Sequence, residues 1–125
     1  MSASLPEKIS TEEIRQHIDT TAMRTQLLEQ IAKDLQIANL DIQVSSENFF
    51  PELAQILENR LLYIIENQVS TLSQIIYQVD LNEARITRLL KTDQNNSAEL
   101  LAEEILRREM QKVFYRNVYN GTIRL

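Results

Sequence analysis

Residues 50–67, FPELAQILENRLLYIIEN, contain the longest dense apolar run of the chain, LLYII at 61–65. Leucine and isoleucine recur every three or four residues in this stretch, as the apolar face of an α-helix requires. Leu62 and Tyr63 extend the apolar surface almost around the predicted helix, and a helix that is apolar on most sides is usually central. Proline at position 51 is compatible with a first helical turn. We therefore expect a central helix over residues 50–67.

The composition of the whole chain extends this helical prediction. The chain has 125 residues, of which 43% are hydrophobic and 25% charged, as in a single globular domain. One glycine and two prolines are too few for the many tight turns of an all-β protein. We predict an all-α fold: one domain over residues 10–125, an irregular or orthogonal bundle of four to five helices, preceded by a loose arm over residues 1–9.

Local signals place the ends of the outer helices. STEE at 10–13 predicts a helix start, because Ser10 or Thr11 can cap free amides and the glutamates suit the positive helix end. DTTAMRT at 19–25 is a weak continuation, so the part before Met23 is either a frayed start or a separate piece. The last helix is expected over about 98–119. Asn120-Gly121 predicts its left-handed end, with a hairpin turn as the alternative.

A different pattern follows the first helical region. In NLDIQV, residues 39–44, apolar and polar side chains alternate, as in a strand. It is the one such run in the chain, and a lone strand has no partner within a monomer. We expect an extended connector at about 39–45 whose alternate side chains contact the core. The competing interpretation is an edge strand that pairs between two subunits.

The absence of cysteine excludes disulfides, thiolate metal sites and a cysteine nucleophile. The N-terminal residues lack the basic start and apolar core of a secretory signal. No apolar run approaches the roughly 20 residues that span a bilayer. We therefore expect a soluble, cytoplasmic protein. The net charge of −5 and pI near 4.9 argue against general affinity for phosphate backbones.

Catalytic chemistry has few candidate residues. His17 is the single imidazole, and the single glycine, Gly121, excludes a glycine-rich phosphate loop. Glu13 and His17 are four residues apart and could reach one ion from a helix face, but the chain lacks the further histidine of a di-metal helical site. We predict a non-enzymatic protein without cofactor or metal.

The last helix carries the predicted partner surface. Arginine and aromatic side chains are favoured in protein interfaces, and here they alternate near the C-terminus. The alternative is a solvated helix face that complements the helix dipole. We predict a helical protein that binds an unknown protein partner or itself. The candidate residues are Arg107, Arg108, Lys112, Arg116, Tyr115 and Tyr119.

A degenerate helix-turn-helix over residues 71–91 is the alternative functional prediction, and it would bind nucleic acid through Arg85, Arg88 and Lys91. The apolar spacing fits that motif. However, Ile76 and Asp80 stand where the motif prefers small residues and glycine. Ordinary packing of two short helices explains the same spacing, with Asp80 or Asn82 as a cap.

Glu109 falls at the edge of the apolar stripe of the last helix. A carboxylate in such a position must be paired or lie at the rim of an interface. Arg85, Arg88 and Lys112 are the candidate partners. We expect a structural ion pair rather than a catalytic acid, because no second catalytic group accompanies it.

Three segments, QIAKDLQIANLDI, LSQIIYQVDLNEARI and LLAEEILRREMQKVFYR, resemble in order a group of short bacterial helical proteins without assigned function. The resemblance covers about residues 28–116 and implies a bacterial, cytoplasmic, helical protein, with no implied activity. The matching residues are Lys33, Asp34, Leu35, Tyr77, Asp80, Glu83, Arg108, Glu109, Gln111, Lys112 and Arg116.

Overall fold

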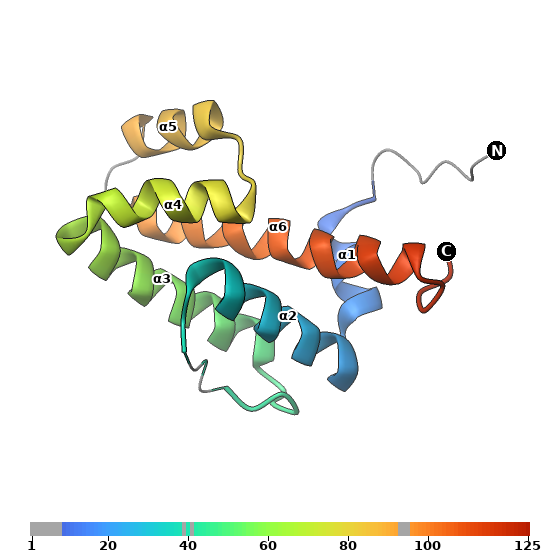
Figure 1. Cartoon of the computed structure of the whole chain (residues 1–125). Coiled ribbons are helices and arrows are strands. Elements are labelled where there is room, and N and C mark those ends of the chain that lie inside the picture. The colour runs from blue at the N-terminus through green and yellow to red at the C-terminus, as the bar shows by residue number, and fades with distance from the viewer. Residues whose placement is uncertain (1–8, 39, 41, 93–95) are drawn as a thin grey trace.

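The computed structural model describes residues 9–38, 40, 42–92 and 96–125. Over these residues the chain forms helices without any strand, so the all-α prediction is confirmed (Figure 1). Residues 1–8 of the predicted arm and residues 93–95 lie outside the described part. The helices are α1 (Thr11–Ile18), α2 (Thr21–Leu35), α3 (Phe49–Asn67), α4 (Val69–Val79), α5 (Glu83–Thr92) and α6 (Ser97–Tyr119).

The centre of the molecule is α6 and not, as the sequence suggested, the helix at 50–67. Figure 1 shows α6 running through the molecule, and it packs against all five other helices. Its buried side chains lie on several sides of the helix and include Leu101, Ile105 and Phe114. The helix α3 instead buries one face and leaves Leu62 and Tyr63 exposed. The helix α3 therefore has more apolar side chains than the neighbouring helices cover.

The described residues form six helices rather than four to five, because the first helical region is divided. Ser10 caps α1 by accepting from the Glu13 amide at 3.1 Å. Thr20 caps α2 by accepting from the Met23 amide at 3.2 Å. A second cap so close to the first ends α1 at Ile18 and starts α2 in a new direction. The weak stretch at 19–25 marks this break.

The C-terminal end of α6 confirms the predicted left-handed stop. Gly121 has φ 85°, a conformation that glycine adopts at little cost. Its amide donates to the Val118 carbonyl at 3.1 Å, and the Ile123 amide donates to the Asn117 carbonyl at 2.8 Å. The turn brings Ile123 back onto the core, where it is buried.

Residues 39 and 41 of the predicted connector lie outside the described part, and the described residues between α2 and α3 form no helix or strand. Leu40 and Ile42 pack against the core and are partly buried. Arg24 of α2 holds the end of the connector by donating to the carbonyls of Val44, at 2.7 Å, and Ser46, at 3.0 Å. Pairing of this segment between subunits stays a prediction. Within the described residues, no helix combines the length and apolarity needed to cross a bilayer.

Candidate functional site

The helix α4 has one face toward the core and one face toward solvent. Leu72, Ile75 and Val79 of α4 point into the core. Tyr77 lies two residues from both Ile75 and Val79, on the opposite side of the helix, and is 81% exposed. Tyr63 and Tyr119 are the other tyrosines with exposed rings in the described part of the chain.

Asp80 ends α4 in the left-handed conformation, with φ 68°. Its amide donates to the carbonyls of Ile76 and Tyr77, both at 3.1 Å. Asn82, rather than Asp80, caps α5, since its Oδ1 accepts from the Arg85 amide at 3.0 Å. Asp80 thus adopts the backbone conformation that glycine adopts most readily, and Asp tolerates it better than most residues.

Two open grooves flank Tyr77. One, of about 490 Å3, lies between α2 and α4 and includes Asp34, Leu35 and Gln78 in its walls. The other, of about 640 Å3, lies toward α5 and includes Ile76, Asp80 and Glu83. Tyr77 contributes to both. Grooves of this size match those that receive side chains or small ligands.

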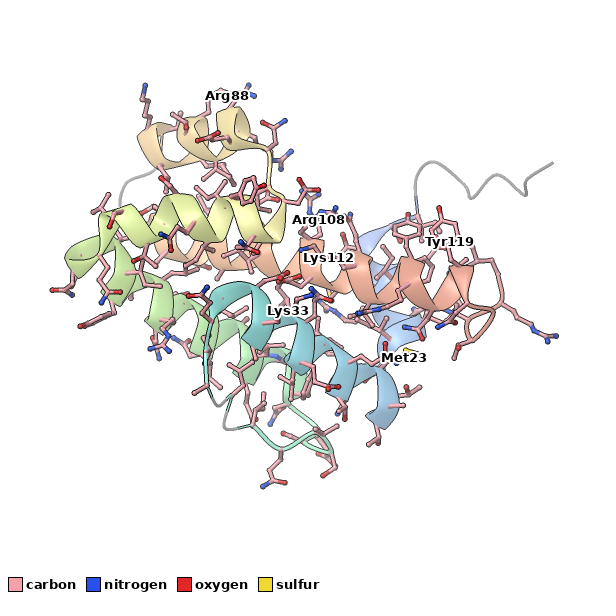
Figure 2. All side chains as sticks on the ribbon, viewed as in Figure 1. Met23, Lys33, Arg88, Arg108, Lys112 and Tyr119 are labelled. Carbon is pink, nitrogen blue, oxygen red and sulfur yellow. The ribbon has the colours of Figure 1, made fainter. Side chains whose placement is uncertain are left out.

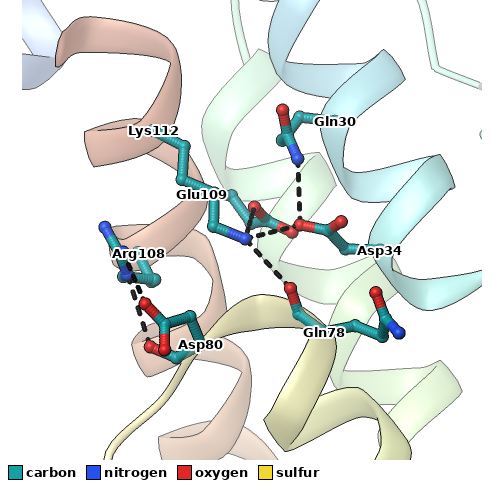
Figure 3. A network of polar contacts seen from close by, with 7 residues as sticks. All are labelled: Gln30, Asp34, Gln78, Asp80, Arg108, Glu109 and Lys112. Atoms are coloured by element: carbon teal, nitrogen blue, oxygen red, sulfur yellow. Dashed lines mark hydrogen bonds and ion pairs between the residues drawn. The ribbon is translucent and has the colours of Figure 1, made fainter. Parts of the chain in front are cut away.

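Behind the first groove, a buried polar network joins three helices (Figure 3). The Lys112 ammonium of α6 donates to Asp34 Oδ2 of α2 at 2.7 Å and to the Gln78 carbonyl of α4 at 3.1 Å. Gln30 Nε2 donates to the same Asp34 oxygen at 3.0 Å. The Gln78 carbonyl belongs to the last turn of α4, where carbonyls lack helical donors and a cation is favourable.

Glu109 completes the network and is fully buried, with 0% of its surface exposed. It lies inside the core rather than at the edge of the apolar stripe. Of its predicted partners, Lys112 is present, with its Nζ 3.4 Å from Glu109 Oε2. Arg85 instead pairs with Glu104 of α6 at 2.7 Å. Lys112 is therefore the predicted cation that does lie beside Glu109, and a second carboxyl group, Asp34, approaches the same ammonium at 2.7 Å.

The two carboxyl groups have opposite pKa shifts. Burial, reinforced by the hydrogen bond with Asp34, raises the pKa of Glu109 from 4.5 to about 8. Burial also acts to raise the pKa of Asp34. Hydrogen bonds from Lys112, Glu109 and Gln30 outweigh that effect, so the pKa of Asp34 is lowered below its usual 3.8. At neutral pH, Asp34 is therefore ionised and Glu109 carries a proton.

The structure separates the six predicted partner-binding residues. Lys112 lies within the buried network, and Tyr115 is half-buried against the ring of Phe114. Arg107 pairs with Glu104 at 2.6 Å, and Arg108 with Asp80 at 3.0 Å. Arg116 and Tyr119 are exposed near the C-terminal end of α6, and Figure 2 shows Tyr119 there. The six residues therefore do not form one continuous exposed surface.

The candidate nucleic-acid residues also differ from one another. Arg85 is tied to Glu104, whereas Arg88 and Lys91 are exposed, and Figure 2 shows Arg88 at the outer side of α5. The helix α5 packs mainly on α6 and makes few contacts with α4. A helix-turn-helix packs its two helices directly on each other, and this pair does not.

Glu13 and His17 are exposed on α1, and the His17 ring lies 5.5 Å from that of Phe114. Among the described residues, no group of three or more metal-ligating side chains occurs. Sequence reasoning placed Lys112 on a surface and did not connect it to Asp34, which is distant in the chain. A lysine and a glutamate three residues apart within an apolar stripe were the one signal of a buried network.

Comparison of the chain with protein-family models, curated proteins and solved structures finds no match.

Proposed function

We propose that this chain is a protein-binding module without catalytic activity, and that its partner docks on the outer face of α4. The observation that supports this proposal is the exposed ring of Tyr77 between two grooves. Tyrosine is favoured in interfaces because its ring has a large apolar surface, few rotatable bonds and a polar end. The flanking grooves offer space for the partner's side chains on both sides of the ring.

The charge of the face indicates the chemistry of the partner. The groove toward α5 is lined by the carboxyl groups of Asp80 and Glu83 and by no cationic side chain, and of these two carboxyl groups Asp80 is paired with Arg108, which lies outside the groove lining. The chain as a whole carries a net charge of −5. A partner that presents apolar and basic side chains on one segment complements both the tyrosine and the carboxylates. We propose such a basic segment of another protein as the occupant.

A photoreactive amino acid at position 77 tests this proposal in cells, with position 63 as the matched control. Tyr63 is also an exposed tyrosine, but it lines neither groove beside α4. We expect position 77 to cross-link a basic segment of one protein, and position 63 not to do so. Equal cross-linking from both positions would refute the proposed docking face. A third variant carries the photoreactive residue at position 119, the exposed tyrosine at the end of α6. Cross-linking from this position alone would place the docking site at the end of α6.

Self-association is the second outcome that the same experiment separates. Cross-links from position 77 to another copy of this chain would make the α4 face a homodimer interface. Light scattering of the purified protein gives an independent answer, because a monomer at micromolar concentration removes self-association as the function.

Nucleic-acid binding through α5 is the alternative proposal, and the exposure of Arg88 and Lys91 favours it. Binding of mixed duplex DNA at low salt, weakening steeply as salt rises, would support it. Replacement of both residues by glutamine should then abolish the binding. Absence of binding at low salt ends this alternative.

A further inference from the structure

The buried network contains two carboxyl groups and one cation. Asp34 is 5% exposed and Glu109 is 0% exposed, and both approach the ammonium of Lys112. Neither oxygen of Glu109 accepts a hydrogen bond from a protein donor. If both carboxyl groups were ionised, the site would hold an unbalanced negative charge away from water, which is strongly unfavourable.

The geometry shows how this charge is avoided. The carboxyl groups of Asp34 and Glu109 approach the same ammonium, with Lys112 Nζ 2.7 Å from Asp34 Oδ2 and 3.4 Å from Glu109 Oε2. One ammonium balances only one carboxylate, so a neutral site needs a proton on one of the two groups. Asp34 already accepts from Lys112 and Gln30, so the proton belongs on Glu109. One carboxylate, one ammonium and one neutral acid then make the site electrically neutral.

We propose that the proton on Glu109 holds the α4 docking face in shape, and that its loss loosens the last turn of α4. This inference rests on the proposed function for its biological meaning, since it describes how that face is regulated. Binding of the partner would then depend on pH, weakening as the pH rises above neutrality.

The coupling passes through Lys112, which serves two helices at once. Its ammonium contacts Asp34 of α2 and the carbonyl of Gln78 of α4. Both Asp34 and Gln78 line the groove beside Tyr77, and Tyr77 directly precedes Gln78. An ionised Glu109 would compete for the same ammonium, whose Nζ is already 3.4 Å away. Drawing Lys112 toward Glu109 weakens its bond to Gln78 and with it the end of α4.

The groups that face the network support this assignment. Lys112 approaches it from α6, Asp34 and Gln30 from α2, and the Gln78 carbonyl from α4 (Figure 3). The neighbouring cation, Arg108, is paired with Asp80 at the surface and does not balance Glu109. The pKa of Glu109, raised to about 8 chiefly by burial, agrees with a proton held at neutral pH.

Hydrogen exchange of the backbone amides tests the inference without any partner. In the wild-type protein, we expect protection of the last turn of α4, corrected for the intrinsic exchange rate, to fall about tenfold between pH 7 and pH 9. In Glu109→Gln, the buried amide cannot ionise, so this protection should not change with pH. Glu103→Gln, at an exposed position of the same helix, is the control and should behave as the wild type.

Identical pH profiles in the wild type and Glu109→Gln would overturn the inference. Should Glu109→Gln fail to fold, the 13C chemical shift of the Glu109 carboxyl in the wild type decides the matter. Titration above pH 7 supports the inference, and a carboxylate already ionised at pH 6 refutes it. Because neither measurement involves a partner, failed cross-linking at position 77 would remove the docking face and leave the proton-linked loosening of α4 intact.

Discussion

Replacing Glu109 with glutamine should stabilise the protein at alkaline pH and leave its stability almost unchanged at acidic pH. The wild-type side chain is fully buried beside Asp34 and Lys112. At low pH it is a neutral acid, and glutamine reproduces its shape and its donor. At high pH the wild type must bury a second carboxylate, whereas the variant keeps a neutral amide.

The magnitude follows from the pKa of Glu109 in the two states. In the unfolded chain the group loses its proton near pH 4.5, and in the folded protein near pH 8. Between these values the folded state binds more protons, so the free energy of unfolding falls as pH rises. The full stabilisation is present below pH 4.5 and is lost as pH rises to about 8. At 1.36 kcal/mol per pH unit, the total loss has an upper limit of about 5 kcal/mol.

Urea denaturation followed by circular dichroism at pH 5, 6, 7, 8 and 9 measures this difference. The stability advantage of Glu109→Gln should grow by about 1.4 kcal/mol per pH unit and level off above pH 8. Asp34 does not interfere, because its lowered pKa keeps it ionised throughout this range. Glu103→Gln removes the same charge from an exposed position and should run parallel to the wild type.

A stability difference that does not vary with pH would refute the protonated Glu109. A difference that shrinks as pH rises would show that the ionised form is the better packed one, with Lys112 as its full partner. Either result would remove the physical basis of the proton-linked docking face.

Three further predictions follow from the same contacts. Lys112→Ala should lower the free energy of unfolding at pH 7, measured by chemical denaturation, by about 3–5 kcal/mol, because it leaves a buried carboxylate without a cation. Arg107→Ala removes a surface pair and should cost less than about 1 kcal/mol. Equal losses in the two variants would contradict this ranking. Asp80→Gly should be about 1 kcal/mol more stable than Asp80→Ala in the same assay. Both variants lose the exposed pair with Arg108, but only alanine is strained at φ 68°. A more stable alanine variant would exclude the left-handed conformation. Tyr77→Ala should change the free energy of unfolding by less than about 0.5 kcal/mol, because the side chain is exposed. The same variant should abolish binding of the cross-linked partner in an assay with purified proteins. Retained affinity would show that the tyrosine ring does not anchor the partner.

Much of the secondary structure could be predicted because its signals are local. Ser10 and Asn82 cap helices through amides three residues away, and Gly121 ends α6 through its own φ. The observed bounds Phe49–Asn67 and Ser97–Tyr119 lie within one residue of those expected. The division of the first helical region needed the structure, since Thr20 caps α2 within a stretch whose pattern was ambiguous.

The candidate site was less predictable, because its members come from three helices. Arg107 and Arg108 were predicted to bind a partner, and Arg85 to pair with Glu109 or to bind nucleic acid. In the structure, Arg85 and Arg107 pair with Glu104, and Arg108 pairs with Asp80. Tyr77 follows two isoleucines in the sequence and is nevertheless exposed. Its exposure depends on which face of α4 the core covers.

By itself, the sequence determined that the protein is helical, where its principal helices begin and end, and that cysteine chemistry is excluded. These properties depend on composition, periodicity and neighbours within a few residues. Only the tertiary structure decided that α6 is central, that Lys112 pairs with the distant Asp34 and that Glu109 is buried beside the same ammonium. The physical reason is that burial and ion pairing depend on which distant side chains packing brings together. The charge state of Glu109, and the proposed control of the α4 face, exist only in that packed arrangement.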